Sequence, residues 1–133
     1  MTDRQWKIGD HFLRSEPDDV FYFAPTGTFN IDDAQRVLPL LRDQFSKRPL
    51  YLLLDARKFE SLTPDARSEV IQHFRPEWVR ACVYVGTNLL MRMVITGINA
   101  VLFLRGTSFP IEFVSTMEEA PDAFARLRIR GAT

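Results

Sequence analysis

Few side chains in this sequence belong to the types that carry out catalysis, and they form no catalytic pattern. The two histidines, His11 and His73, are predicted on different elements, and neither belongs to a Ser–His–Asp order or to a metal-ligand spacing. The one cysteine, Cys82, lies within an apolar run, where a thiol is more typically an inert core residue than a nucleophile. Three pairs of adjacent carboxylates stand where a turn or a helix start is predicted: Asp18–Asp19, Asp32–Asp33 and Glu118–Glu119. The sequence therefore indicates a protein that is not an enzyme and that holds no metal or cofactor.

Polar side chains that could bind an anion follow two apolar runs, 50–56 and 81–86. In open α/β sheets, ligands bind at the carboxyl ends of strands, and free amides at a helix start can hold an anion. The sequence has no Gly-x-Gly-x-x-Gly motif and no phosphate-loop lysine, however, and short polar residues at such junctions commonly bond the local backbone. A polar or anion site and a purely structural role both stay open for six residues: Asp55, Arg57, Thr63, Gly86, Thr87 and Asn88.

Segment 89–104, LLMRMVITGINAVLFL, is apolar around most of its circumference when it is drawn as a helix. It is shorter than the roughly 20 residues that a membrane-spanning helix needs. A surface helix requires an apolar arc of somewhat over about 100°, and this segment has roughly twice that. We expect one stripe to face the core, formed by Leu90, Val94, Ile98 and Val101.

The surplus of apolar surface on segment 89–104 has three interpretations. The helix is buried on several sides within the chain, or it forms a protein interface, most simply a homodimer, or it contacts an apolar ligand or a membrane surface. Methionine adapts to varied partners, and Gly97 would let another backbone approach closely. The candidate interface or ligand residues are Leu89, Met91, Met93, Ile95 and Leu102.

The elements that position these residues follow from hydrophobic periodicity. Strands at 10–15 and 20–24, joined by the turn EPDD, predict an antiparallel hairpin, and a helix follows from Asn30 to Phe45 with a kink or break at Pro39. From residue 50 onward strands and helices alternate, which implies right-handed crossovers and a mostly parallel sheet. Strands are expected at 50–56, 81–86 and 111–115, and helices that begin at Thr63, Asn88 and Thr116. The prediction is one α/β domain over residues 1–133, with a mixed sheet of about five strands and about four helices.

Composition narrows the classes of partner. Lys and Arg total 17 and Asp and Glu total 17, so the formal net charge is zero, which argues against nucleic acid as a partner. A nearly neutral chain also has little charge repulsion against self-association. The start of the sequence has no apolar stretch behind basic residues, and a single cysteine cannot form an internal disulfide. We therefore expect a cytoplasmic protein.

Three stretches carry a resemblance to a known group: LLLDARKFESLTPDAR, ACVYVGTNLLMRM and FVSTMEEAPDAF. Together they resemble the STAS-like and CRAL-TRIO-like small α/β domains of bacteria over roughly residues 10–127. The STAS resemblance implies regulation through protein contacts, and the CRAL-TRIO resemblance implies binding of an apolar ligand or lipid. Regulatory STAS domains carry Asp-Ser-Ser-Gly at the helix start, where this chain has Thr63, Pro64, Asp65 and Ala66.

The resemblance therefore comes without the family's phosphorylation switch. By count from Asp55, the switch serine falls on Pro64, which has no hydroxyl, and neither Ser61 nor Thr63 holds the matching position. The expected function is a non-catalytic regulatory or protein-interaction domain of STAS-like type that self-associates through segment 89–104. The alternative is a binding or carrier protein for a lipid or another apolar small molecule.

Overall fold

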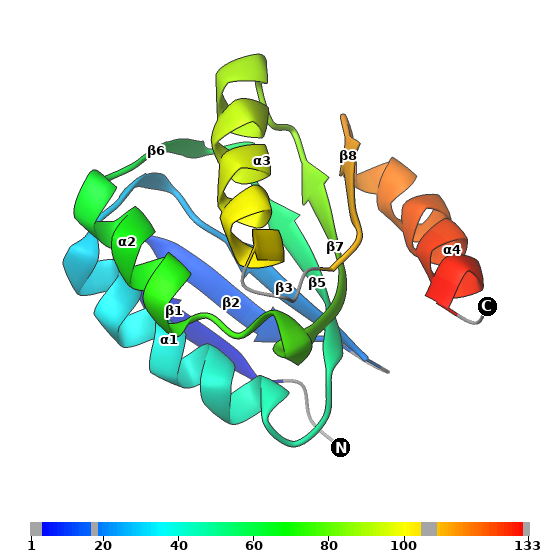
Figure 1. The fold of residues 1–133 in the computed structure, drawn as a ribbon, viewed down its shortest axis with the longest axis horizontal. Coiled ribbons are helices and arrows are strands. Elements are labelled where there is room, and N and C mark those ends of the chain that lie inside the picture. The colour runs from blue at the N-terminus through cyan, green and yellow to red at the C-terminus, as the bar shows by residue number, and fades with distance from the viewer. Residues whose placement is uncertain (1–3, 17–18, 105–108, 132–133) are drawn as a thin grey trace.

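A computed structural model of the protein describes residues 4–16, 19–104 and 109–131, and over these ranges helices cover both faces of one mixed sheet (Figure 1). Pro17 and Asp18 of the predicted turn and acidic pair lie outside the described residues. Within them, the strand order of the main sheet is β1-β2-β3-β5-β7-β8, and β4 pairs with β6 in a separate two-stranded sheet. The strands are β1 (Gln5–Ile8), β2 (His11–Ser15), β3 (Val20–Ala24), β4 (Gly27–Phe29), β5 (Leu50–Asp55), β6 (Phe59–Leu62), β7 (Val79–Val85) and β8 (Ile111–Val114).

The pairing directions agree with the predicted mixed sheet. β1, β2 and β3 are antiparallel neighbours, while β3, β5, β7 and β8 run parallel to one another. The two central strands β5 and β7 read as continuous apolar runs because both of their faces are covered. The predicted fold class, a single mixed α/β domain with an N-terminal antiparallel hairpin, is confirmed.

Three short strands were not predicted, so the expectation of about five strands is too low for the described chain. β1 has four residues, of which only Trp6 and Ile8 pack against the core, while Lys7 between them is exposed and charged. This short stretch gave only a weak hydrophobic pattern. β4 and β6 are short, and they pair in parallel with each other across a long sequence separation. Pairing of this kind leaves little trace in local periodicity.

Four helices and two short 3-10 turns complete the described chain. α1, α2 and α3 pack on one face of the sheet, and α4 packs on the other (Figure 1). Capping residues set the helix starts, as predicted, with Asn30 before α1 and Thr63 before α2. The helices are α1 (Ile31–Phe45), α2 (Pro64–His73), α3 (Leu89–Leu104) and α4 (Ala120–Gly131), and the 3-10 turns are η1 (Pro76–Trp78) and η2 (Met117–Glu119).

Of the kink or break predicted at Pro39, the break is wrong, because α1 continues through this residue as one helix, and the kink stays a prediction. Pro39 lies on the exposed side of α1, where water can bond the backbone carbonyl that loses its intrahelical partner. The opposite side packs into the core and holds the helix together on both sides of the proline. Its buried apolar residues are Ala34, Val37, Leu38, Leu41 and Phe45.

α3 is rotated relative to the predicted core-facing stripe. Leu90 is 70% exposed and Val101 is 37% exposed, whereas Met91 and Leu102 are buried. Val94 and Ile98 of the predicted stripe are half-buried. The Asn88 side chain caps the helix by accepting the Met91 N–H at 2.8 Å, which fixes where α3 begins.

The same exposures overturn one interpretation of α3. Large apolar side chains near both ends of α3 are in contact with solvent, among them Leu89 at 76% exposed and Leu104 at 83% exposed. Burial of the entire helix within the chain is therefore excluded for the residues that the structure describes.

Candidate functional site

Asp55 ends β5 as a buried carboxylate whose two oxygens are bonded within the chain. Arg57 donates to it twice, from Nε to Oδ1 at 2.8 Å and from Nη2 to Oδ2 at 2.7 Å. The Tyr22 hydroxyl on β3 donates to Oδ2 at 2.6 Å, and the Arg57 N–H donates to Oδ1 at 3.2 Å. Burial alone would raise the pKa of Asp55, but the hydrogen bonds from Arg57 and Tyr22 outweigh it and hold this pKa below its ordinary value.

The pKa values of the two partners of Asp55, Tyr22 and Arg57, are both raised. Burial, and then the hydrogen bond to Asp55, raise the pKa of Tyr22 to about 12, while the Asp55 carboxylate raises the pKa of Arg57. Gly86, at φ +74, leaves room for this arrangement, since a Cβ at that position would stand 2.6 Å from Arg57 Cγ. The cluster is thus a neutralised ion pair that links β3, β5 and the loop after β5 beside the end of β7. An ionised and fully bonded carboxylate is poorly suited to accept a proton from a substrate.

Thr87 and Asn88 lie directly before α3, and both accept hydrogen bonds from its first residues. Thr87 is buried, and its Oγ1 accepts the Arg92 Nε–H at 3.1 Å, while the Arg92 guanidinium lies 5.0 Å from the centre of the Phe113 ring. Asn88 caps the helix, as described above, so one of the amides of the proposed anion site already has an acceptor. The predicted cap is confirmed, and the predicted anion site stays a prediction.

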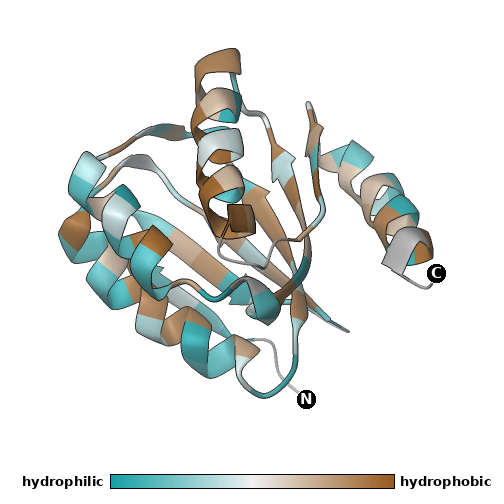
Figure 2. Cartoon of the chain, viewed as in Figure 1, coloured by the Kyte–Doolittle hydropathy of each residue, from teal (hydrophilic) through white to brown (hydrophobic). Residues whose placement is uncertain are grey.

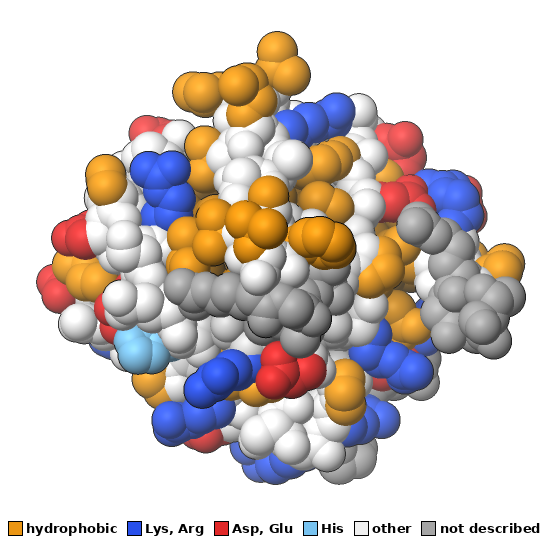
Figure 3. Space-filling model, viewed as in Figure 1, with side chains coloured by type: hydrophobic (Ala, Val, Ile, Leu, Met, Phe, Trp, Pro, Cys, Tyr) orange, Lys and Arg blue, Asp and Glu red, His pale blue; other side chains and the backbone are white. Residues whose placement is uncertain are grey.

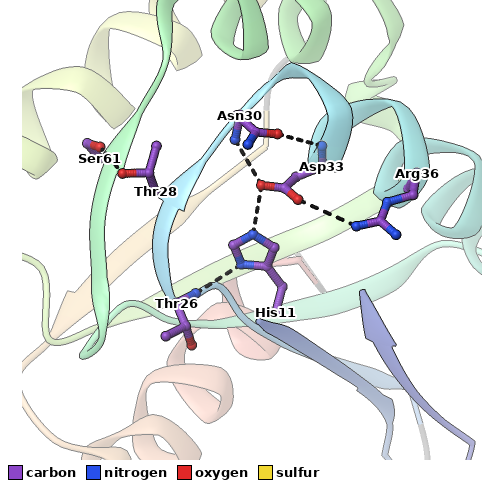
Figure 4. Close-up of polar contacts among 7 residues, drawn as sticks. All are labelled: His11, Thr26, Thr28, Asn30, Asp33, Arg36 and Ser61. Carbon is purple, nitrogen blue, oxygen red and sulfur yellow. Dashed lines mark hydrogen bonds and ion pairs between the residues drawn. The ribbon is translucent and has the colours of Figure 1, made fainter. Parts of the chain in front are cut away.

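Thr63 does not join the Asp55 cluster by any contact. Its Oγ1 accepts the Ala66 N–H at 3.3 Å and donates to Asp65 Oδ1 at 2.6 Å, and its N–H donates to the Phe29 carbonyl at 3.1 Å. Ser61 pairs its hydroxyl with that of Thr28 on β4 at 2.9 Å (Figure 4). Both hydroxyls near the start of α2 are therefore engaged locally.

The sequence did not reveal a buried network around His11 and Asp33. His11 Nδ1 accepts the Thr26 N–H at 3.0 Å, and Nε2 lies 3.0 Å from Asp33 Oδ2 (Figure 4). Asp33 Oδ2 also accepts the Asn30 N–H at 3.0 Å, and Arg36 stands 3.8 Å from Oδ1. A signal existed, since His11 and Leu13 alternate inward along β2, and a histidine on such a face needs a polar partner.

The hydrogen bonds of His11 indicate which of its two ring nitrogens carries the proton. An Nδ1 that accepts a backbone N–H leaves the proton on Nε2, which donates it to the Asp33 carboxylate. The network ties the start of α1 to the turn between β3 and β4. With both ring nitrogens used and the ring buried, His11 is a structural residue, as its position outside any catalytic pattern suggests.

The five candidate residues of α3 divide between its two sides. Met91, Ile95 and Leu102 point inward and line an apolar cavity, whereas Leu89 and Met93 are exposed. We call the exposed side the outer face of α3; hydrophobic residues colour most of the helix in Figure 2, and their side chains gather over it in Figure 3. The outer face consists of Leu89, Leu90, Met93, Thr96, Gly97, Ala100, Val101, Phe103 and Leu104.

The part of the chain that the structure describes has no candidate metal site and no candidate membrane-spanning helix. Its histidine, cysteine and acidic side chains form no group of three or more that could hold a metal ion. None of its helices is long and apolar enough to cross a membrane.

Two solved structures show which known fold this arrangement matches. An uncharacterized protein of the DUF3478 family with a SpoIIAA-like fold, from Shewanella loihica PV-4, superposes with a TM-score of 0.57 at 17% identity, over 91% of this chain and 90% of that chain. The anti-sigma factor antagonist SpoIIAA in its unphosphorylated form superposes with a TM-score of 0.57 at 12% identity, over 90% of this chain and 96% of its own. No family model and no curated protein matches the sequence.

These structures establish the fold as SpoIIAA-like, which is the STAS side of the resemblance. The CRAL-TRIO side has no support among them. The resemblance was carried by the strand that ends at Asp55 and the capped starts of α2 and α3, and these are structural features of the fold.

Replacing Asp55 by asparagine tests the buried ion pair. We expect Asp55→Asn to lower the free energy of unfolding by about 1.5–3 kcal/mol at neutral pH, because Arg57 and Tyr22 lose a charged acceptor. Since the pKa of Asp55 is depressed in the folded protein, its contribution is complete above the ordinary value of 3.8 and is lost as the pH falls through the folded value. Urea unfolding at several pH values should show the difference from wild type disappearing in acid. Glu60→Gln, an exposed change on β6, is the control, and a difference that persists unchanged in acid would contradict the assignment.

The two histidines offer a matched test of the His11 network. His11→Ala leaves the Thr26 N–H and the Asp33 carboxylate without their partner, so we expect a loss of about 2–4 kcal/mol in the free energy of unfolding. His73→Ala, on the exposed side of α2, should stay within about 0.5 kcal/mol of wild type. Chemical denaturation of both variants measures this, and equal effects would refute a structural role for His11.

Proposed function

We propose that the protein is a non-catalytic STAS-type regulatory domain that works through protein contacts, and that it self-associates through the outer face of α3. The observation that carries the proposal is the exposure of large apolar side chains along one helix, including Met93 at 64%. Large exposed apolar patches mark interaction sites in soluble domains, and here two groups of such side chains, near the start and the end of α3, lie on one side of the helix. The SpoIIAA-like fold supports the regulatory class.

The charge on α3 favours a protein over a lipid surface as the partner. Helices that lie on membranes carry lysine and arginine along their polar side to meet anionic headgroups. α3 carries a single cation, Arg92, and this side chain is engaged with Thr87 and Phe113. The outer face has no charged residue, and Thr96 is its one polar side chain, so it presents mainly apolar surface.

A second copy of the chain fits this face. Met93, Gly97, Ala100 and Leu104 follow at spacings of four, three and four residues, which places them on one side of the helix. A Cβ built on Gly97 meets nothing within 4 Å, so the middle of the face is low and open between larger side chains. A self-complementary patch of ridges around a groove suits a two-fold contact, where each copy inserts its side chains beside the glycine of the other.

The free energy gained by burying the outer face of two copies is comparable to the cost of their association. A Leu, Met or Phe side chain contributes about 1.5–3 kcal/mol when it is fully buried from an exposed state. Several such residues on each of two copies therefore offset an association cost of about 4–15 kcal/mol. Because the outer face has no charged residue and the net charge of the chain is zero, electrostatic repulsion does not oppose the association of two copies.

The proposed domain lacks the phosphorylation switch of its STAS relatives. Pro64 occupies the first position of α2, and a proline there suits the helix start but has no hydroxyl to modify. Regulation would then pass through the occupancy of the α3 face.

Charge placed on the outer face should separate the copies. We expect a dimer for the wild-type chain and a monomer for Met93→Asp, because a carboxylate in an apolar contact loses its hydration. Ile129→Asp is the matched control, since Ile129 is 68% exposed on α4, on the other side of the sheet. Light scattering behind a sizing column gives the masses, and circular dichroism checks that each variant is folded. A wild-type monomer, or a dimer that survives Met93→Asp, would refute the proposed contact.

A larger side chain at Gly97 should stabilise the monomer but weaken dimerisation. In the monomeric Met93→Asp background, Gly97→Ala should raise the free energy of unfolding by about 0.5–1 kcal/mol, because alanine favours the helix and its Cβ meets open space. In the otherwise wild-type chain, Gly97→Leu should weaken dimerisation by filling the groove. Thermal unfolding and sedimentation at several concentrations measure the two effects. Stronger dimerisation of Gly97→Leu would show that the backbones do not approach at this residue.

A further inference from the structure

An apolar cavity of about 160 Å³ lies between the inward side of α3, helices α1 and α2, and the sheet. Met91, Ile95 and Leu102 of α3 form one wall, and Val70 and Phe74 of α2 contribute to another. The cavity is partly open to the surface. Close-packed cores leave few voids larger than a water molecule, so an apolar opening of this size beside the core is a candidate ligand site.

The volume and the lining define the size and charge of a fitting molecule. An engineered apolar cavity of about 150 Å³ stays free of water and binds benzene. This cavity is of similar volume, and none of the described residues that line it is charged, so an ionised ligand would be costly to bury there. The molecule that best fits this volume is therefore compact and neutral.

Tyr84 and Asn99 are the two residues with polar side chains among the described residues that line the cavity. The Tyr84 hydroxyl is hydrogen-bonded to Cys82, so the carbonyl oxygen of Asn99 specifies the remaining chemistry. Asn99, on the inward side of α3, lines the cavity, and its Oδ1 is buried with no hydrogen bond to any protein group. Over the described residues it is the one buried side-chain oxygen or nitrogen in this state. Buried polar atoms in native proteins are nearly always paired, and a carbonyl oxygen can be satisfied only by a donor.

We propose that this cavity binds a compact neutral molecule of about the size of one aromatic ring, with a single O–H or N–H group that donates to Asn99 Oδ1. The apolar walls bury the body of the ligand, and the amide oxygen selects the molecule that carries a donor. Selection of this kind is strong, because a ligand without the donor leaves the buried acceptor unpaired. The site lies on the inward side of α3 and is independent of the contact proposed for the outer face.

Phenol and toluene form a matched pair of probes, alike in size but different in the hydroxyl. Titration calorimetry with the wild-type chain should show phenol binding about tenfold more tightly than toluene, which is the effect of one hydrogen bond of about 1.4 kcal/mol. Asn99→Leu should remove this preference, so that toluene binds at least as well as phenol. Ile95→Phe should fill the cavity and abolish binding of both probes. Circular dichroism shows which variants fold, and Val70→Phe replaces Ile95→Phe if the latter does not.

The outcomes decide the proposal without reference to the oligomeric state. The same titration with Met93→Asp should give the wild-type preference for phenol, since Met93 lies on the other side of the helix. Failure of the wild-type chain to bind either probe overturns the ligand site. Equal affinity for phenol and toluene, or a preference for phenol that survives Asn99→Leu, overturns the role of Asn99. None of these results bears on whether the chain dimerises.

Discussion

The central strands β5 and β7 are apolar on both faces, and the rest of the structure depends on covering them. α4 closes one face with a tight cluster that includes Phe124 and Leu127. The other face carries the larger apolar cluster, and three helices share it. α3 contributes to this cover with one side only. The two features with functional interest, an exposed apolar face and an apolar cavity, lie on the two sides of this helix.

Polar contacts hold this arrangement at one end of the sheet, where β3, β5 and β7 finish and β2 begins. At the carboxyl ends of β5 and β7, the Asp55–Arg57 pair packs against Gly86, and Thr87 anchors Arg92 immediately afterwards. At the start of β2, the His11–Asp33 bond joins this strand to the start of α1. His11, Asp33, Asp55 and Thr87 are buried and bonded within the chain, so the polar residues explain the fold more fully than they explain any chemistry.

The sequence predicted the elements whose signals are local. The apolar run that ends at Asp55, the caps at Asn30, Thr63 and Asn88, and the alternation of strands and helices all follow from neighbouring residues. The pairing of β4 with β6 and the contact of His11 with Asp33 depend on residues far apart in the chain, and no periodicity reports them. The rotation of α3 was also missed. α3 is apolar around most of its circumference, and its narrow polar stripe of Arg92, Thr96 and Asn99 gives little indication of which apolar side turns inward.

The start of α2 and the outer face of α3 differ in how far their groups are bonded within the chain. The hydroxyl of Thr63 caps the helix and is bonded to Asp65, and Ser61 is bonded to Thr28 across two strands. The hydroxyls at the start of α2 are thus already bonded within the chain. α3 has the opposite character, because its exposed apolar side gains stability from any suitable partner that covers it.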